Sequence, residues 1–376
     1  MKAVSLFAGI GGFDLGLARS GIEVELLCEK AAAPAAVLKS RFPGIAFHDD
    51  VTTLPSIPRT DLLCAGFPCQ DLSAPGKKAG IQGERSGLVS HVFRLIDEAG
   101  PRAVLLENVA FMLKLQRGEA IARLAEAFEE RGYRWAYRVV DARSFVPQRR
   151  ERVILFATRE GPDPADILLA DEAQAPEDLP DFTAAAHGFY WTEGRNGLGL
   201  VRDAIPTLKS GSTIGLCSAP AVIMPDGNVV TPDIRDAERF QGFPVDWTKP
   251  AEAVGGEASR WFAIGNAMCV PVAGWVGSRI VNPGALDRSR CRPFQDRWPK
   301  AAYGSAGGRM QVDISSFPHW VARPPLSRFL EHPGKPLSAR ATAGFLRRAS
   351  MSKNLNFRSG FLDRLERHRD AMAVTR

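Results

Sequence analysis

Residues 3–12 read AVSLFAGIGG, a short apolar run that ends in three glycines within four positions. A run of this length predicts a buried strand, and the glycines predict a tight turn whose backbone amides stay open to a ligand. The following stretch, Phe13 to Ser20, ends at Gly21 and is typical of a helix with a glycine stop. We therefore expect a strand, a turn and a helix whose N-terminus faces a nucleotide-like cofactor. Because the glycines do not complete the GxGxxG fingerprint, a plain connecting turn is an alternative.

The same alternation of apolar runs and amphipathic stretches continues to about residue 158. Four further strands are expected at Glu23 to Cys28, Asp61 to Ala65, Ala103 to Glu107 and Arg152 to Ala157. Further helices are expected at Ala31 to Arg41, Gly87 to Ala99 and Gly118 to Arg131. This rhythm predicts an α/β fold: a doubly wound, mostly parallel sheet with helices on both faces and functional groups at the carboxyl ends of its strands.

The pattern changes in residues 159–230, which are rich in acidic residues, proline and glycine and predict a smaller, loop-rich domain. Thr231, with a proline next to it, predicts the N-cap of a short helix that ends at Phe240. Residues 258–281 then predict a helix broken near Pro271. The expected regions are 1–158, 159–230, 231–284 and a basic C-terminal extension at 285–376.

The positive charge of the chain is concentrated at its C-terminal end. The formal net charge is +6, but residues 281–376 hold 18 Lys and Arg against 7 Asp and Glu, while residues 1–280 hold 30 against 35. A basic face of this kind predicts a phosphate-rich partner such as double-stranded DNA. A solvated, arginine-rich surface is an equally good interpretation.

The composition limits the class of protein. A chain of 376 residues that is 45% hydrophobic can form a full α/β core with one or two smaller domains beside it. No run approaches the roughly 18 apolar residues of a membrane span, and the start MKAVSLFAGIGG lacks a secretory cleavage site, so we expect a soluble cytoplasmic protein without membrane contact. The six cysteines form no CxxC pair, which predicts neither a disulfide framework nor a metal site.

The segment GFPCQ, residues 66–70, follows the predicted strand at 61–65 and contains a candidate nucleophile. It places the Cys69 thiol at the carboxyl end of the sheet, beside the glycine turn. Cys64 lies inside the strand and is expected to be a core residue. The glycine-rich residues 71–87 could close over a substrate. Three cations of this segment could bind DNA phosphates: Lys77, Lys78 and Arg85.

A carboxyl group and an arginine-rich run are expected at the same end of the sheet. Glu107 ends a strand there, so it shares a cleft with the thiol, where burial would let it act as a proton donor. Residues 148–152, QRRER, lead into the next strand, where alternate side chains point to one side. Those side chains are Gln148, Arg150 and Arg152. A solvated charged face is the alternative for both features.

Two acidic residues are placed to bind a nucleotide-like cofactor. Glu29 follows the second strand about 20 residues after the glycine turn, where a carboxylate would hold ribose hydroxyls. Asp50 follows the next expected strand and could meet an adenine ring.

The glycine turn, PCQ, ENV and QRRER occur here in an order that resembles the cytosine-5 DNA methyltransferase family, in its bacterial restriction-modification type. Residues 231–247, TPDIRDAERFQGFPVDW, and Gly265-Asn266-Ala267 with Pro271 are similar to further motifs of that family. The resemblance covers residues 1 to about 280 apart from the variable stretch 159–230. It implies a Rossmann-like fold dependent on S-adenosylmethionine, with S-adenosylhomocysteine as product and residues 159–230 as the target-recognition region.

The resemblance also implies roles for the motif residues. Cys69 would add to carbon 6 of a cytosine flipped out of the duplex, Glu107 would contact ring nitrogen 3 and the exocyclic amine, and Arg152 would bind the carbonyl oxygen. Arg150 would support the site. Positions that match the family's cofactor contacts are Phe7, Gly9, Ile10, Gly11, Glu29, Asp50, Pro68, Leu88, Asn266 and Ala267. Expected DNA contacts are Gln70, Ser73, Lys77, Lys78, Arg85, Gln148, Arg195, Arg202 and Lys209.

Several alternatives remain open at this stage. The short variable region predicts a short recognition sequence. For the restriction-modification type we also expect a monomer in the bacterial cytoplasm, associated with the nucleoid, and a cognate restriction endonuclease that acts on the same site without a stable complex. A solitary regulatory DNA methyltransferase would carry the same motifs. A transfer RNA methyltransferase is disfavoured because its Cys-Phe-Thr motif is missing. The intact set of cysteine, glutamate and arginine argues against an inactive homologue, and a nicotinamide-dependent oxidoreductase would need a fuller glycine fingerprint and gives no role to PCQ and ENV. The extension 285–376 is expected to grip DNA or, alternatively, to serve packing or dimerisation.

Overall fold

The computed structural model describes residues 1–67, 87–177, 181–195, 197–211, 219–353 and 355–374. The chain divides into two compact units that alternate along the sequence. The first unit comprises Met1–Ser144, Glu151–Ala175 and Met268–Trp320. The second unit comprises Phe145–Arg150, Pro176–Ala267 and Val321–Arg376.

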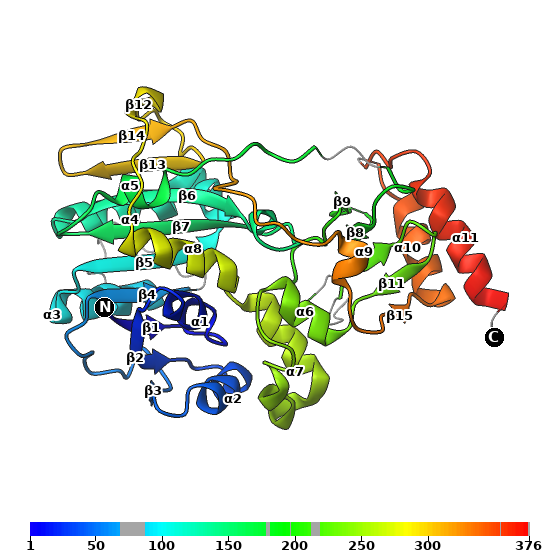
Figure 1. Ribbon diagram of the computed structural model, residues 1–376, viewed down its shortest axis with the longest axis horizontal. Coiled ribbons are helices and arrows are strands. Elements are labelled where there is room, and N and C mark those ends of the chain that lie inside the picture. The colour runs from blue at the N-terminus through cyan, green and yellow to red at the C-terminus, as the bar shows by residue number, and fades with distance from the viewer. Residues whose placement is uncertain (68–86, 178–180, 196, 212–218, 354, 375–376) are drawn as a thin grey trace. The chain divides into compact units, whose positions relative to one another are not determined.

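The first unit is built on a ten-stranded sheet. Its strands are β1 (Lys2–Leu6), β2 (Glu23–Cys28), β3 (Ala46–His48), β4 (Leu62–Ala65), β5 (Ala103–Val109), β6 (Arg134–Asp141), β7 (Glu151–Thr158), β12 (Cys291–Pro293), β13 (Ala301–Ser305) and β14 (Gly308–Val312). Their order is β12-β14-β13-β6-β7-β5-β4-β1-β2-β3, which Figure 1 shows as a continuous stack.

The two halves of this sheet differ in strand direction. Strands β5, β4, β1, β2 and β3 are mutually parallel, and they include the first four strands that the sequence predicts. The other strands join in antiparallel fashion, β7 beside β5, then β6, then the β13–β14 hairpin and β12. The predicted doubly wound α/β sheet is therefore confirmed, and its antiparallel half is an addition that the sequence pattern did not reveal. We call the end at which β1, β2, β4 and β5 finish the carboxyl end of the sheet.

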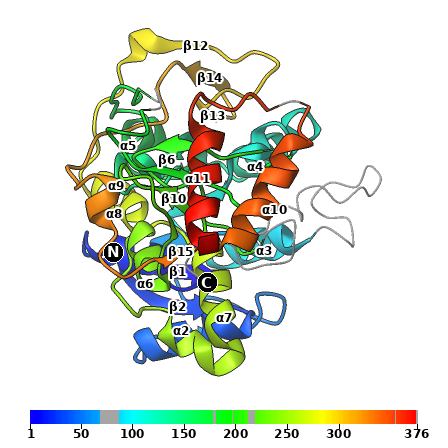
Figure 2. The same ribbon diagram turned by 90° about the vertical axis from the view of Figure 1, so that its right-hand side faces the viewer.

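Helices cover both faces of the sheet. They are α1 (Gly12–Ala18), α2 (Ala32–Arg41), α3 (Leu88–Ala99), α4 (Glu119–Glu130), α5 (Pro164–Leu168) and α8 (Val270–Val281), with short 3-10 turns η2 (Ala110–Leu113), η3 (Leu115–Gly118), η4 (Ala142–Ser144) and η6 (Arg288–Arg290). Figure 2 shows α3 and α4 on one side of the sheet and α5 and α8 on the other. Phe93 of α3 and Phe128 of α4 pack edge to face with ring centroids 5.3 Å apart, in a core of buried aliphatic residues.

Glycines bring α1 against α8. A Cβ atom at Gly16 would lie 2.5 Å from the Cβ of Ala273, and one at Gly12 would lie 2.3 Å from the carbonyl oxygen of Met268. Only glycine permits this approach without movement of one helix. The glycines that follow the first strand therefore serve helix packing as well as the turn.

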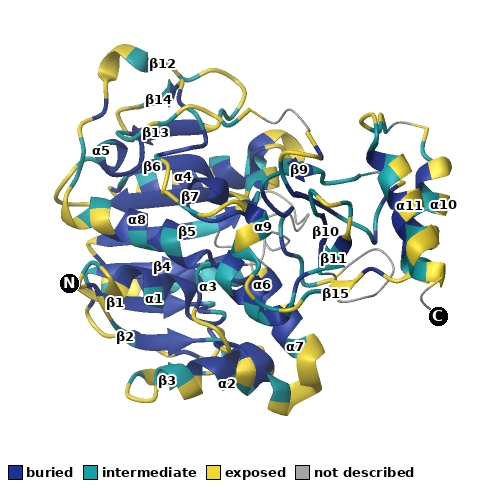
Figure 3. Ribbon diagram, turned by 45° about the vertical axis from the view of Figure 1, so that its right-hand side comes forward, coloured by how far each residue is buried: buried dark blue, intermediate teal, exposed yellow. Residues whose placement is uncertain are grey.

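The second unit contains a small antiparallel sheet. Its strands are β8 (His187–Phe189), β9 (Val201–Arg202), β10 (Ala221–Ile223), β11 (Val229–Thr231) and β15 (Lys335–Pro336), in the order β15-β11-β10-β8-β9. Its helices are α6 (Ile234–Phe240), α7 (Glu252–Asn266), α9 (Leu326–Phe329), α10 (Ala339–Ser350) and α11 (Phe361–Val374), with the 3-10 turn η5 (Lys249–Ala251). Phe345 of α10 and Phe361 of α11 pack against Phe189 with centroids 5.4 Å away in each case. Figure 3 shows exposed residues along the outer sides of α10 and α11.

The start of α6 differs from the prediction. Thr231 was expected as the N-cap, but it ends β11, where its partner is Lys335. The cap is Asp233, whose Oδ1 accepts a hydrogen bond of 2.9 Å from the Arg235 backbone amide. Pairing with the C-terminal strand holds Thr231 extended, so the helix begins later. The predicted break near Pro271 is confirmed, because α7 ends at Asn266 and α8 carries this proline in its first turn.

The segment 285–376, predicted as a separate extension, is divided between the two units. Residues 285–320 supply β12, β13 and β14, which pair with the otherwise open side of β6. Residues 321–376 supply β15, α9, α10 and α11 to the second unit. Each half of the segment covers a surface that would otherwise be exposed. Without β13, β6 would expose a row of unpaired backbone groups, and without α10 and α11 the apolar face of the small sheet would be exposed.

Candidate active site

The glycine turn at the end of β1 is held in an unusual backbone conformation. Phe7, Gly9 and Gly11 have φ angles of 53°, 59° and 85°, in the left-handed region that favours glycine. A Cβ at Gly11 would lie 2.5 Å from the Phe42 ring. A Cβ at Gly9 would meet no described atom within 4 Å, so the backbone there faces open space. This geometry suits the close approach of a ligand to main-chain amides. Ile10, between these glycines, is buried.

Glu29 lies against this turn. Its Oε2 accepts a hydrogen bond of 2.9 Å from the Gly9 amide, and its Oε1 accepts one of 2.7 Å from the Ala31 amide. Burial raises the pKa of the Glu29 carboxyl above its usual range. Each carboxylate oxygen keeps a further lone pair, so the group could also accept hydrogen bonds from two adjacent hydroxyls, as a ribose offers.

Asp50 lies beyond the end of the next strand. Its Oδ2 is 2.7 Å from Lys30 Nζ, and its Oδ1 accepts from the Thr52 amide at 2.9 Å. The Lys30 ammonium and the Thr52 donors lower the pKa of Asp50 to about 2. The Asp50 carboxylate is therefore charged at neutral pH and can accept a hydrogen bond from an amine such as that of adenine.

The register of the parallel strands places the turn and the two acids in one row. Leu6 of β1 pairs with Cys28 of β2, which pairs with His48 of β3. The groups that follow these three residues therefore lie side by side at the carboxyl end of the sheet. Together they offer a nucleoside-containing cofactor backbone amides, an acceptor for ribose hydroxyls and a second acid.

The other predicted cofactor positions are distributed more widely. Leu88 is half-buried in the first turn of α3, and Pro68 lies outside the described residues. Asn266 is exposed and Ala267 is buried at the end of α7 in the second unit.

The strand that leads to Cys69 leaves the sheet beside Glu107. A Cβ at Gly66 would lie 3.6 Å from Glu107 Oε2. The buried Asn108 side chain donates from Nδ2 to the Phe67 carbonyl at 3.1 Å, so the end of β5 holds the end of β4. Cys69 itself lies outside the described residues, as do Gln70, Ser73, Lys77, Lys78 and Arg85. Cys64, by contrast, is buried within β4, and its burial raises the pKa of its thiol well above the usual range.

Glu107 and Arg152 form an ion pair at the carboxyl end of the sheet. Arg152 Nε is 2.8 Å from Glu107 Oε1, and the two side chains are only 16% and 14% exposed. The antiparallel register of β5 and β7 places them together, because Val109 pairs with Arg152 and Glu107 pairs with Ile154. A carboxyl and a guanidinium in this arrangement can contact two neighbouring polar atoms on the edge of a planar ring.

Gln148 and Arg150 form hydrogen bonds within the second unit. Gln148 has no exposed surface; its Nε2 donates to the Phe240 carbonyl at 2.9 Å, and its Oε1 accepts from the Leu208 amide at 2.9 Å. Arg150 is 2% exposed, and its guanidinium donates to the carbonyls of Gly265 at 3.2 Å and Ala267 at 2.8 Å. The expected DNA contact of Gln148 is therefore corrected to an internal role, because its amide is enclosed and already paired. Arg150 holds the carbonyls at the end of α7, and its expected role in supporting the catalytic residues stays a prediction.

Comparison with known proteins matches this arrangement to one family. The family model "C-5 cytosine-specific DNA methylase" matches residues 1–187. The Type II methyltransferase M2.BsuMI of Bacillus subtilis (strain 168) is 44% identical over 387 residues, which covers 98% of each chain. The chain belongs to the C-5 cytosine-specific DNA methylase family.

One further relative and one solved structure are also similar to this methylase. The Type II methyltransferase M.HhaI of Haemophilus parahaemolyticus is 32% identical over 42% of the methylase and 49% of its own length. A crystal structure of S. pombe Dnmt2 methyltransferase superposes with a TM-score of 0.54 at 15% identity and covers 75% of the methylase and 98% of that chain. That last likeness shows the shared fold. The methylase is thus a DNA cytosine-5 methyltransferase of the S-adenosylmethionine-dependent class. No described helix of the methylase is long and apolar enough to cross a membrane.

The expected DNA-contacting residues of the second unit differ in their surroundings. Arg195 is exposed, and its carbonyl accepts from Ser352 Oγ at 2.9 Å. Arg202 lies half-buried in β9. Lys209 Nζ is 3.4 Å from Glu193 Oε1 and 3.9 Å from the Tyr190 ring centroid, so part of its charge is already engaged.

Two residues of the methylase site were not assigned a role from sequence. Asn108 ties the end of β4 to β5, and a polar residue that follows a candidate acid at a strand end could have indicated this. Asp14, in the first turn of α1, is 2% exposed, and burial raises the pKa of its carboxyl to about 7. An acid among the apolar residues of the first helix was the available signal, but its burial depends on how α1 packs against β1.

Proposed function

We propose that this methylase transfers the methyl group of S-adenosylmethionine to carbon 5 of a flipped cytosine in duplex DNA, with Cys69 as covalent nucleophile. The observation that carries the proposal is the ion pair of Glu107 and Arg152, beside the strand end that leads to Cys69. The family membership of the chain supports the substrate class.

The reaction requires a temporary nucleophile because carbon 5 of cytosine is a weak nucleophile. The Cys69 thiolate forms a bond to carbon 6, and the displaced electron pair of the 5,6 double bond makes carbon 5 nucleophilic. When bound, the cofactor supplies an electrophilic methyl group on a sulfonium. After methyl transfer, loss of the carbon 5 proton and of the Cys69 thiolate restores the double bond.

Glu107 and Arg152 would hold the polar edge of the ring during these steps. Glu107 would share a proton with ring nitrogen 3 and accept from the exocyclic amine, which stabilises the charge that develops when the thiolate adds. Arg152 would donate to the carbonyl oxygen. Their low exposure keeps water away and strengthens these interactions.

The cofactor would bind along the ends of β1, β2 and β3. Gly9 and its neighbours would receive the amino-acid part and the sulfonium, Glu29 the ribose hydroxyls and Asp50 the adenine amine. The open space over Gly9 and the remaining lone pairs of Glu29 support this assignment. The remaining proposed contacts are Phe7, Ile10, Gly11, Pro68, Leu88, Asn266 and Ala267. No metal takes part in the proposed reaction.

The target carbon is inaccessible in a stacked duplex, so the base must leave the helix. The proposed contacts with the vacated space and with phosphates are Gln70, Ser73, Lys77, Lys78 and Arg85, and those in the second unit are Arg195, Arg202 and Lys209. The names of the relatives M2.BsuMI and M.HhaI as Type II methyltransferases support a role as the modification enzyme of a restriction-modification system. We propose that the enzyme is a monomer in the bacterial nucleoid and that a cognate endonuclease cuts the same DNA sequence that it methylates.

The first experiment measures transfer of a labelled methyl group from S-adenosylmethionine to DNA, to RNA or to protein alone. We expect label in DNA only, and none with Cys69→Ser. Cys291→Ser is the matched control, since Cys291 is a partly exposed cysteine in β12. Label in RNA alone would overturn the proposal, as would full activity of Cys69→Ser.

Bisulfite sequencing of plasmid DNA from an expressing host identifies the modified sequence. We expect one short sequence to be protected throughout the plasmid. A genome that encodes an endonuclease for the same sequence would support the restriction-modification role, and its absence would favour a solitary regulatory enzyme.

A further inference from the structure

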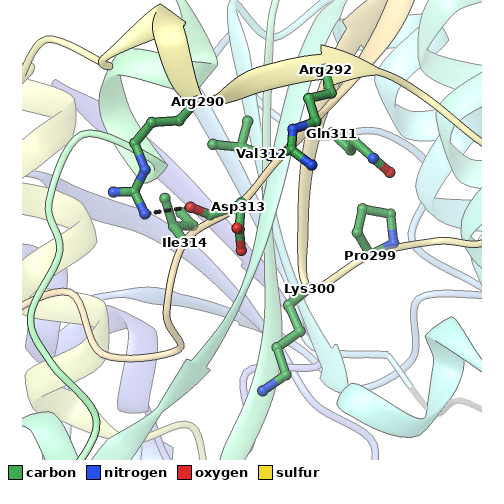
Figure 4. Close-up of a pocket in the computed structure, with 8 residues that line it drawn as sticks. All are labelled: Arg290, Arg292, Pro299, Lys300, Gln311, Val312, Asp313 and Ile314. Atoms are coloured by element: carbon green, nitrogen blue, oxygen red, sulfur yellow. Dashed lines mark hydrogen bonds between the residues drawn. The ribbon is translucent and has the colours of Figure 1, made fainter.

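The antiparallel side of the first sheet carries a cavity that the proposed chemistry does not use. Its volume is about 250 Å³. At roughly 30 Å³ per water molecule, it has room for a phosphate group with part of its hydration. Figure 4 shows the side chains that line it: Arg290, Arg292, Pro299, Lys300, Gln311, Val312, Asp313 and Ile314.

The cavity is lined by residues of β12 and β14 and by the segments that flank β12, β13 and β14. Arg292 faces Gln311 directly across the β12–β14 pair, so their side chains lie on the same face of the sheet. Arg290 is braced: its guanidinium bonds to the Glu172 carboxylate and to the Asp313 carbonyl. Lys300 immediately precedes β13. The pairing of β12 with β14 therefore fixes part of the lining, and the segments that flank these strands and β13 supply the rest.

The charges in the cavity favour a singly charged anion. Arg292 and Lys300 are exposed and form no ion pair within the described parts of the chain. Glu172 offsets the charge of Arg290, and the Asp313 carboxylate offsets one of the other two cations. One net positive charge remains, which suits a phosphodiester better than a triphosphate. The Gln311 amide adds an uncharged donor.

The strand register aligns this cavity with the ion pair of the proposed active site. Glu107 of β5 pairs with Ile154 of β7, which pairs with Arg138 of β6, which pairs with Ala301 of β13. Lys300 precedes Ala301, so it lies level with the residue that follows Glu107. The cavity is thus at the carboxyl end of the sheet, as Glu107 is.

The number of intervening strands sets the separation. Three strand spacings separate β5 from β13, and five separate β5 from β12. At about 4.8 Å per spacing, this is roughly 14 to 24 Å along the end of the sheet. For a duplex whose axis runs along this end of the sheet, a rise of 3.4 Å per base pair makes the distance about four to seven base pairs.

We propose that this cavity binds a backbone phosphate of the DNA duplex, about four to seven base pairs from the target cytosine. Arg292 and Lys300 provide the charge, and Gln311 provides a neutral hydrogen bond. The inference rests on the proposed function, because the duplex is placed by the flipped base at Glu107. It assigns a part of the basic C-terminal segment to a defined site.

The test compares two double variants of the full-length protein. Arg292→Gln with Lys300→Gln removes the two unpaired cations of the cavity. The control, Arg19→Gln with Arg59→Gln, removes two exposed arginines that follow α1 and precede β4, at the end of the sheet where β2 and β4 begin. Thermal unfolding of both variants checks that the fold is intact, and charge reversal to glutamate at positions 292 and 300 provides a second, stronger change.

The main measurement is the affinity for a DNA duplex of about 30 base pairs at several salt concentrations. We expect the cavity variant to bind about tenfold more weakly at low salt, with a slope of log K against log salt reduced by about one or more. Charge reversal should weaken binding further, and the control should match the wild type. Equal affinities and slopes for the cavity variants and the wild type would overturn the proposal.

A second measurement locates the contact. Once the modified sequence is known, the duplex is shortened on either side of the target from about ten base pairs to about three. We expect shortening on one side to weaken binding of the wild type but not of the cavity variant. Equal losses in both proteins would refute the assigned position.

Inorganic phosphate serves as the alternative probe. Tight phosphate binding that the cavity variant loses, with no change in duplex affinity, would show a site for a free anion and overturn the DNA assignment. Wild-type methyl transfer to DNA is measured separately, so a failure of the proposed function is distinguishable from a failure of this inference.

Discussion

At the scale of single residues, Glu107 and Arg152 hold each other in place before any substrate arrives. Their 2.8 Å contact fixes both side chains near the strand end that leads to Cys69. Such preorganisation reduces the reorganisation that a bound ring would otherwise demand. Both residues were predictable because they stand at strand ends in adjacent motifs. The enclosure of Gln148 was not predictable, because it depends on Phe240 and Leu208, which lie far away in sequence.

Replacing Glu107 by glutamine tests its role. Glu107→Gln removes the carboxyl that would share a proton with the ring, so we expect turnover to fall by about 100-fold or more. Cofactor affinity should be unchanged, since Glu29 and Gly9 lie at the ends of other strands. Single-turnover methylation and cofactor titration measure the two effects. Glu126→Gln, at an exposed position of α4, is the control. Near-normal turnover of Glu107→Gln would remove Glu107 from the mechanism.

The buried carboxyl of Asp14 predicts a pH dependence of stability. Its pKa is raised from 3.8 to about 7 by burial, so between these pH values the folded protein keeps a proton that the unfolded chain has released. The free energy of unfolding therefore falls as the pH rises from about 4 to about 7, by on the order of 4 kcal/mol. Asp14→Asn should remove this dependence, so the stability of the variant relative to the wild type should be higher at pH 8 than at pH 5.

Denaturant unfolding at several pH values measures this effect. Glu126→Gln, at an exposed position of α4, is the control and should follow the wild type. Parallel pH curves for wild type and Asp14→Asn would contradict the assignment.

At the scale of elements, the contact between α1 and α8 joins two distant parts of the chain. The predicted glycine turn was correct in position, but the packing need of Gly16 becomes clear only with α8 in place. The parallel strands were predictable from their apolar runs and glycine stops. The hairpin of β13 and β14 was missed, although Gly307 and Gly308 stand at its turn and are a hairpin signal. Thr231 was misassigned as a cap because its strand partner, Lys335, lies 104 residues away.

A methyl group at Gly16 should disturb this element pair. Gly16→Ala places a Cβ 2.5 Å from Ala273 Cβ and 2.6 Å from the Val270 carbonyl, so one helix must shift. We expect a loss of about 1 to 3 kcal/mol in the free energy of unfolding. Gly44→Ala is the matched control, because a Cβ there meets no described atom within 4 Å. Equal denaturation midpoints for the two variants would contradict the packing argument.

At the scale of the whole molecule, the basic C-terminal segment is part of both units rather than an appendage. It completes the large sheet through β13 and covers the small sheet through Phe345 and Phe361. Charge counting revealed that the segment is basic. It could not reveal this division, because the pairing of β13 with β6 and the packing on Phe189 are long-range.

Truncation tests this view. A chain that ends at residue 284 lacks three strands of the first sheet and the helices α10 and α11, so we expect it to be insoluble or to lose cooperative unfolding and cofactor binding together. Circular dichroism during heating and cofactor titration are the measurements. A soluble fragment with a sharp transition and normal cofactor affinity would show that the segment is a removable module.

The alternation of the two units along the chain has a consequence for how such enzymes diversify. The polypeptide passes between the units five times, after residues 144, 150, 175, 267 and 320. A single genetic crossover would therefore exchange fragments of both units at once and leave each with mismatched partners. New sequence preferences should arise chiefly by point changes within loops, and chimeras with a transplanted second unit will require several coordinated junctions.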